Sequence, residues 1–360
     1  MSETLFRVRD YCRVCVVACG VLAFAGHTPA AAQAPPGTPA QAGQQRPAGS
    51  PPRTSTPEKR AKPAPWSPPR TPWGHPDLQG LWTNRTITPL QRPSRLQDQA
   101  TLSDEEAAAL EDEARTRNDR LPTAGNPGTY SQFWWEMGKV VRGKRTSLVI
   151  DPPDGRIPPL TPEAQQAILE SRRGRGTADS WEDRTLFERC ITRGLPGAMI
   201  PGFYNHNYQI VQTPGVVAIL VEMIHDVRII PLDGRPHLGQ SLRLWMGDSR
   251  GRWEGDTLVV ETTNFSDKTR AHGFFEGQEH MRLVERFTRV SPDVIDYAFT
   301  VEDPTTLARP WTAAIPMSKT DEPVLEFACH EGNEAIAGIL AGERAVEKAA
   351  AGAAGAAAEK

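Results

Sequence analysis

Side chains that can carry acid–base chemistry are concentrated in residues 201–237, where three of the eight histidines stand among carboxylates, amides and tyrosines. They interleave with apolar residues at the spacing of a β-strand, so we expect them to be half buried. A buried polar group must find a partner or bind something. The candidate catalytic residues are His206, Tyr208, Glu222, His225 and Asp226.

In one interpretation these side chains belong to an enzyme that needs no cofactor, a hydrolase or a lyase/isomerase. His206 or His225 is then the general base, oriented by Glu222 or Asp226, and Tyr208 donates a hydrogen bond to an oxyanion. A buried hydrogen-bond network without any ligand is the structural alternative.

In a second interpretation the protein is an exported binder of an unknown small molecule, held in the cavity of a barrel-like sheet. Apolar walls with a few convergent polar groups are typical of such cavities. Further ligand contacts are expected from Asn205, Asn207, Arg250, Arg252, His330 and Glu331. A structural envelope protein, tethered by its N-terminal arm, is a third possibility.

The two arginines among these contacts lie in residues 247–255, which we interpret as a loop at the mouth of the barrel. There Arg250 or Arg252 could clamp a carboxylate or a phosphate, although solvated turn charges would look the same. The spacing of His, Cys and acidic residues matches no metal motif, so we expect neither a metal site nor a cofactor.

The elements that must position these residues are mostly strands. Continuous or alternating apolar runs predict strands at residues 203–210, 216–221, 222–228, 257–262, 281–290, 294–302, 311–315 and 324–329. Short turns without intervening helices favour an antiparallel sheet, closed or nearly closed. The predicted fold is mainly β (α+β), a barrel-like antiparallel sheet with an N-terminal wrap of loops and short helices.

Helix signals lie in the wrap. Ser103 and Glu106 form a capping box before a helix that should reach Arg117, and Thr161 precedes Pro162 at a second helix start that should run to Arg172. A third, short helix is expected at residues 181–190. Tyr130 and the aromatic run at residues 133–135 are expected to pack in the core, and an exposed patch on which a sugar or an aromatic ligand stacks is the alternative.

The chain divides into four parts. Residues 1–32 have the basic start, short apolar run and small-residue end of a signal peptide, with a lipid-anchored Cys19 as the less favoured alternative. Residues 33–72 form a Pro/Ala-rich disordered linker, and residues 345–360 a low-complexity Ala/Gly tail. Residues 73–344 form one β-rich domain, with the wrap in 73–195 and the sheet in 196–344.

Cleavage of the signal would leave Cys190 and Cys329, which we expect to pair in an oxidising compartment, although two separate thiols remain an alternative. The formal net charge of −3 offers no basic stripe for nucleic acid. No second segment is long and apolar enough for a transmembrane helix. We therefore expect a periplasmic or extracellular protein.

Four stretches resemble a family of exported, uncharacterised bacterial proteins: residues 74–82 (GHPDLQGLW), 204–209 (YNHNYQ), 248–262 (DSRGRWEGDTLVVET) and 329–333 (CHEGN). The resemblance implies export and a β-rich core, and no chemistry. Residues 80–82 (GLW) also resemble the Gly-x-Trp pattern of lipocalin-type barrels, in which the Trp closes one end.

Overall fold

The computed structural model describes residues 66–116, 132–172, 178–267 and 279–358. The predicted signal peptide, Cys19, Tyr130 and most of the predicted linker lie outside these residues. None of the helices in the described segments is long and apolar enough to cross a membrane.

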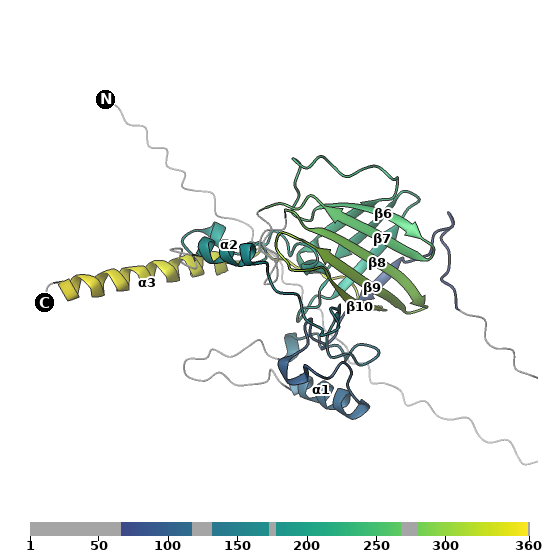
Figure 1. Ribbon diagram of the computed structural model, residues 1–360, viewed down its shortest axis with the longest axis horizontal. Coiled ribbons are helices and arrows are strands. Elements are labelled where there is room, and N and C mark those ends of the chain that lie inside the picture. The colour runs from purple at the N-terminus through teal and green to yellow at the C-terminus, as the bar shows by residue number, and fades with distance from the viewer. Residues whose placement is uncertain (1–65, 117–131, 173–177, 268–278, 359–360) are drawn as a thin grey trace, which may run out of the picture. The chain divides into compact units, whose positions relative to one another are not determined.

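Nine strands form one antiparallel sheet in the order β5-β4-β3-β1-β10-β9-β8-β7-β6, and a tenth, β2, pairs with β10. Their bounds are β1 (Gly80–Thr83), β2 (Val149–Asp151), β3 (Asn207–Gln212), β4 (Val216–Val221), β5 (Val227–Pro231), β6 (Asp248–Glu254), β7 (Thr257–Thr263), β8 (Arg282–Ser291), β9 (Val294–Glu302) and β10 (Trp311–Lys319). Strands β6 to β10 lie side by side in Figure 1. The structure confirms a mainly β fold with a nearly closed antiparallel barrel.

The two end strands of this order approach each other where Gly251 of β6 faces β5. A β-carbon at position 251 would lie 2.8 Å from Ile230 and 2.7 Å from Leu232, closer than real side chains pack. Only glycine lets the backbone of β6 come this near to the side chains of Ile230 in β5 and of Leu232 just after it. The absence of a side chain at this position therefore helps to close the barrel.

Large apolar side chains fill the interior. On β9 alternate residues point inward, so Ile295, Tyr297, Phe299 and Val301 are at most 1% exposed. The largest of the other buried side chains, Trp82, Trp311 and Phe287, come from β1, β10 and β8. This packing gives the sheet a single continuous core.

The helix starts in the wrap follow their capping signals. Helix α1 (Asp104–Thr116) begins after Ser103, whose hydroxyl accepts from the Glu106 amide at 3.1 Å while Glu106 accepts from the Ser103 amide at 2.8 Å. Helix α2 (Pro162–Arg172) begins after Thr161, whose hydroxyl accepts from the Ala164 amide at 3.1 Å. Both predicted N-termini are confirmed.

Three predicted elements differ in the structure. Residues 222–228 contain the 3₁₀-helix η5 (Met223–His225), in which Ile224 and His225 have φ near +60°, before β5 starts at Val227. Residues 324–329 form no strand, because side chains take up their backbone amides. Residues 247–255 are mostly β6 and no loop.

At the ends of the domain the structure extends further than the sequence pattern indicates. Thr71, placed in the linker by composition, is buried, and Arg70 hydrogen-bonds to Asp256 at 2.5 Å. Helix α3 (Ala335–Ala358) runs through most of the Ala/Gly-rich tail. In the region predicted as a third helix, the structure has only the 3₁₀-helix η3 (Trp181–Asp183) and turns.

Candidate functional site

The candidate residues meet at one end of β3 and β4. Asn205, with φ of +55°, makes the turn that leads into β3, and His206 follows it. His206 is 3% exposed; its amide approaches a Glu136 carboxylate oxygen at 3.4 Å, and its carbonyl accepts from the Asn84 amide at 3.3 Å. Burial, with the nearby charges of Arg193 and Arg85, lowers the pKa of His206 to about 3. Its imidazole is therefore neutral near pH 7.

Tyr208 points into the barrel from β3. Its hydroxyl accepts from the Asn84 side-chain amide at 2.9 Å and donates to the Ala198 carbonyl at 3.1 Å. Burial raises its pKa above the ordinary value. The hydroxyl that we predicted as an oxyanion donor thus has two protein partners.

Glu222 and His225 bind backbone amides of a distant segment. The Glu222 carboxylate, 1% exposed, accepts from the amides of Asn207 at 3.0 Å and Leu325 at 2.9 Å. Nε2 of His225 accepts from the Phe327 amide at 2.6 Å, which requires the tautomer protonated at Nδ1. Together they hold residues 325–327 against the end of the barrel.

Asp226 accepts from the Thr192 hydroxyl at 2.7 Å, and burial raises its pKa. Close by in the sequence, Cys190 forms a disulfide with Cys329, with 2.06 Å between the sulfurs. The bond anchors the segment that Glu222 and His225 hold. His330 and Glu331, which follow Cys329, are exposed.

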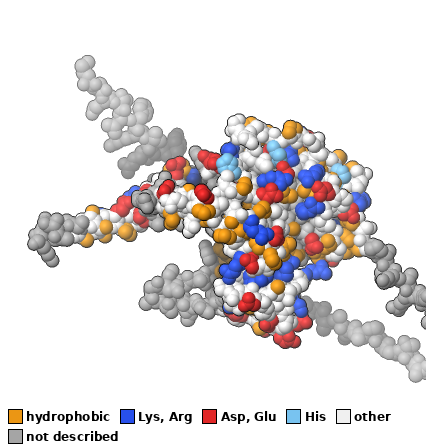
Figure 2. Space-filling model, viewed as in Figure 1, with side chains coloured by type: hydrophobic (Ala, Val, Ile, Leu, Met, Phe, Trp, Pro, Cys, Tyr) orange, Lys and Arg blue, Asp and Glu red, His pale blue; other side chains and the backbone are white. Residues whose placement is uncertain are grey.

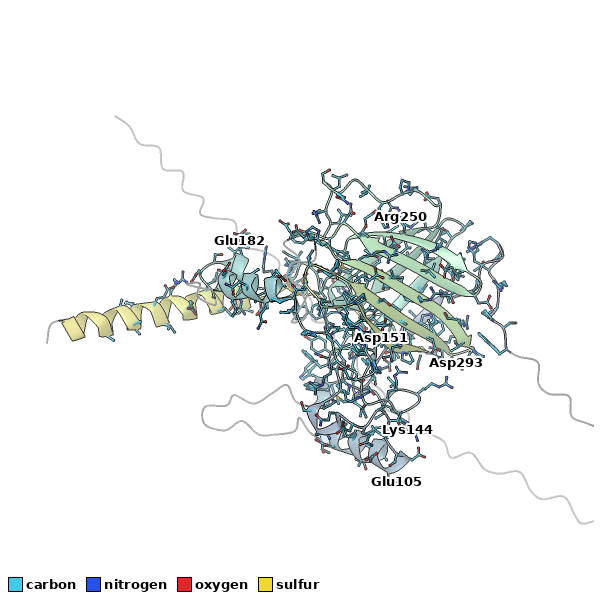
Figure 3. All side chains as sticks on the ribbon, viewed as in Figure 1. Glu105, Lys144, Asp151, Glu182, Arg250 and Asp293 are labelled. Atoms are coloured by element: carbon cyan, nitrogen blue, oxygen red, sulfur yellow. A yellow bond between two sulfur atoms is a disulfide. The ribbon has the colours of Figure 1, made fainter. Side chains whose placement is uncertain are left out.

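Two of the predicted ligand-binding residues lie on another part of the barrel. Arg250, labelled in Figure 3, and Arg252 are on β6. Arg250 pairs with Asp248 at 2.6 Å, and Arg252 pairs with Glu254 at 2.8 Å. Arginines and carboxylates mix across this face in Figure 2. The structure therefore gives both arginines acidic neighbours and does not bring them to His206.

Asn205 and Asn207, two further predicted ligand contacts, lie in different surroundings. Asn207 is buried, and its side-chain oxygen has no hydrogen-bond partner in the described part of the protein. Asn205 serves the turn through its backbone. In the described segments, no three His, Cys, Asp or Glu side chains gather in a way that could hold a metal ion.

A hollow of about 190 Å³ lies beside this cluster. Three segments line it, Thr86–Leu90, Trp135–Met137 and Ile200–Gly202, together with Leu148. The Glu136 amide donates to the Phe203 carbonyl at 2.9 Å, and the Leu148 amide to Pro89 at 2.9 Å, so backbone bonds fix the walls. Glu136 connects the hollow to His206 through its carboxylate.

Sequence reasoning missed the residues that bring charge to this region. Glu136 and Arg193 stand in irregular segments where no periodicity indicates a face. Two others had a signal: Glu285 alternates with Leu283 and Phe287 on β8, and Arg228 lies between apolar residues on β5. That alternation predicts an inward-facing carboxylate.

No known protein family matches the sequence, and no curated protein or solved structure matches it either. Function therefore has to be inferred from the geometry of this region.

Proposed function

We propose that this is an exported small-molecule-binding protein whose ligand occupies the hollow between Thr86–Leu90, Trp135–Met137 and Ile200–Gly202. The presence of this hollow is the main observation in favour of a binding function. Most of the residues that line it have apolar side chains, polar atoms make up the larger part of its exposed surface, and Glu136 supplies a charged group next to His206. This mixture is typical of small-molecule sites.

The size of the hollow limits the ligand. Sites for drug-sized molecules enclose about 300–1,000 Å³, whereas this one encloses about 190 Å³. We expect a compact ligand with an apolar body. The barrel interior is a less favoured place for it, because Trp82, Tyr297, Phe299 and Trp311 are packed there.

Binding is favoured over acid–base catalysis by the state of the candidate residues. His206 has a pKa of about 3 and so is a weak base, and Tyr208, Glu222 and His225 each have protein partners. A general base must be free to reach a substrate proton. These groups are better suited to fixing the walls of a site.

Export is supported by the basic and apolar start of the chain and by the Cys190–Cys329 bond, since disulfides persist in oxidising compartments. We propose on the same grounds that the chain belongs to the family of exported bacterial proteins that its four motifs resemble.

A fragment screen by saturation-transfer NMR on the purified protein tests the binding proposal. Met137→Trp places an indole in the hollow, and Leu169→Trp, at a position 59% exposed on α2, is the matched control. We expect fragments that bind the wild type and Leu169→Trp but not Met137→Trp. A screen without hits, or hits that Met137→Trp leaves unchanged, would contradict the proposal.

A further inference from the structure

One arginine near the hollow lacks a counter-charge. Nε of Arg193 is buried without a hydrogen-bond partner, and no carboxylate in the described part of the chain lies within ion-pair distance of its guanidinium. Arg85 and Arg228, by contrast, pair with Glu322 and Glu285. An uncompensated, partly buried cation is costly unless something binds it.

The groups around Arg193 do not neutralise it. The ring of Phe187 lies 5.7 Å from the guanidinium carbon. His206 is neutral, and its pKa is lowered partly by Arg193, which shows that the two groups are near each other. Burial lowers the pKa of Arg193 itself, with the nearby Tyr208 and Tyr204 acting in the opposite direction. None of these neighbouring groups carries a negative charge that would neutralise Arg193.

Gly202 places no side chain in front of the guanidinium fork of Arg193. A β-carbon at position 202 would lie 3.5 Å from both Nη1 and Nη2 of Arg193 and 3.9 Å from Cζ. Being nearer to both nitrogens than to the carbon, this point stands in front of the fork and not above its face. A carboxylate accepts two parallel hydrogen bonds from that edge. Gly202 also lines the hollow, so this edge of the guanidinium adjoins the proposed binding site.

We infer that Arg193 is the anchor for the carboxylate of a small organic acid, whose apolar body occupies the hollow. The inference rests on the proposed function and adds the chemical class of the ligand. Gly202 contributes because it has no side chain. Any other residue at this position would place its side chain in front of the guanidinium fork of Arg193.

Calorimetric titration with benzoate and its neutral isostere benzamide tests the inference. We expect the wild type to bind benzoate at least tenfold more tightly, as one bidentate charged pair would provide. Arg193→Gln should abolish this preference, because it should weaken benzoate binding far more than benzamide binding. Arg252→Gln, on β6, is the control for a general loss of positive charge and should change nothing.

Two variants at position 202 keep the test independent of any folding defect at Arg193. Gly202→Asp places a carboxylate in front of the fork, so it should abolish the benzoate preference and raise the melting temperature relative to Gly202→Asn. Ordinary van der Waals distances at this position mean that neither should disturb the fold.

The outcomes separate the two proposals. Equal binding of benzoate and benzamide, lost in Met137→Trp, would overturn the carboxylate anchor and leave the binding function standing. A benzoate preference that survives Arg193→Gln would also overturn the anchor. Binding of neither probe by the wild type would overturn the anchor, and a fragment screen without hits would overturn the binding function as well.

Discussion

The ion pair between Arg228 and Glu285 is enclosed in the barrel, and removing one partner should destabilise the fold strongly. Nη1 of Arg228 donates to Oε1 of Glu285 at 2.9 Å, and Nη2 donates to Oε2. The Tyr297 hydroxyl donates to Oε1 at 2.9 Å. The two charged side chains are 2% and 0% exposed. Burial opposes the charge of Arg228, but Glu285 outweighs it and raises the pKa of the arginine.

Glu285→Gln keeps the shape and removes the charge. Arg228 then becomes an unpaired buried cation whose Nε already lacks a partner. Breaking such a pair costs about 3–5 kcal/mol in unfolding free energy. At roughly 2 °C per kcal/mol for a domain of this size, the melting temperature should fall by about 6–10 °C.

A double-mutant cycle with Arg228→Met and Glu285→Leu, followed by urea unfolding, measures the coupling. With both charges gone no ion is left buried, so the double variant should lie within about 2 kcal/mol of the wild type, or above it. The exposed pair of Arg282 and Glu302 provides the control, and Glu302→Gln should cost at most about 1 kcal/mol.

The reasoning would be refuted if Glu285→Gln cost no more than the control. Strict additivity in the cycle would refute it as well, because independent costs mean that the two charges do not stabilise each other.

Three further predictions concern the end of the barrel. The pKa of His206 is about 3 in the folded state and about 6.5 in the unfolded chain, so acid protonates the unfolded chain first. The folding stability that is present above pH 6.5 is therefore lost as the pH falls towards 3. Between pH 7.5 and 4.5 the wild type should lose about 2–3 kcal/mol relative to His206→Gln in urea unfolding; parallel pH profiles would contradict this. Reduction of the Cys190–Cys329 bond, which spans 139 residues, should cost about 4–5 kcal/mol, and two free thiols in the mass spectrum of untreated protein would exclude the bond. Glu222→Gln weakens two buried hydrogen bonds, so stability should fall by about 2 kcal/mol and the Leu325 amide should exchange faster with deuterium; unchanged exchange would show that the carboxylate does not hold this segment.

Elements with local signals could be predicted from the order of the residues alone. The alternation in residues 294–302 and the apolar run in residues 216–221 predict the bounds of β9 and β4 as the structure has them. Ser103 and Thr161 mark the first turns of α1 and α2. Each of these signals acts within one strand or one helical turn, so it does not depend on the rest of the fold.

The contacts of the polar residues could not be predicted in this way, because they depend on how distant segments pack. Residues 222–228 look like one strand, yet 222–226 fold into a turn before β5, so that Glu222 can reach the Leu325 amide, 103 positions away in the chain. Likewise, nothing around Arg193 or Gly202 in the sequence indicates that the fork of one faces the other. Periodicity reports which face a side chain takes, whereas its partner depends on how distant segments pack, and that information is not local.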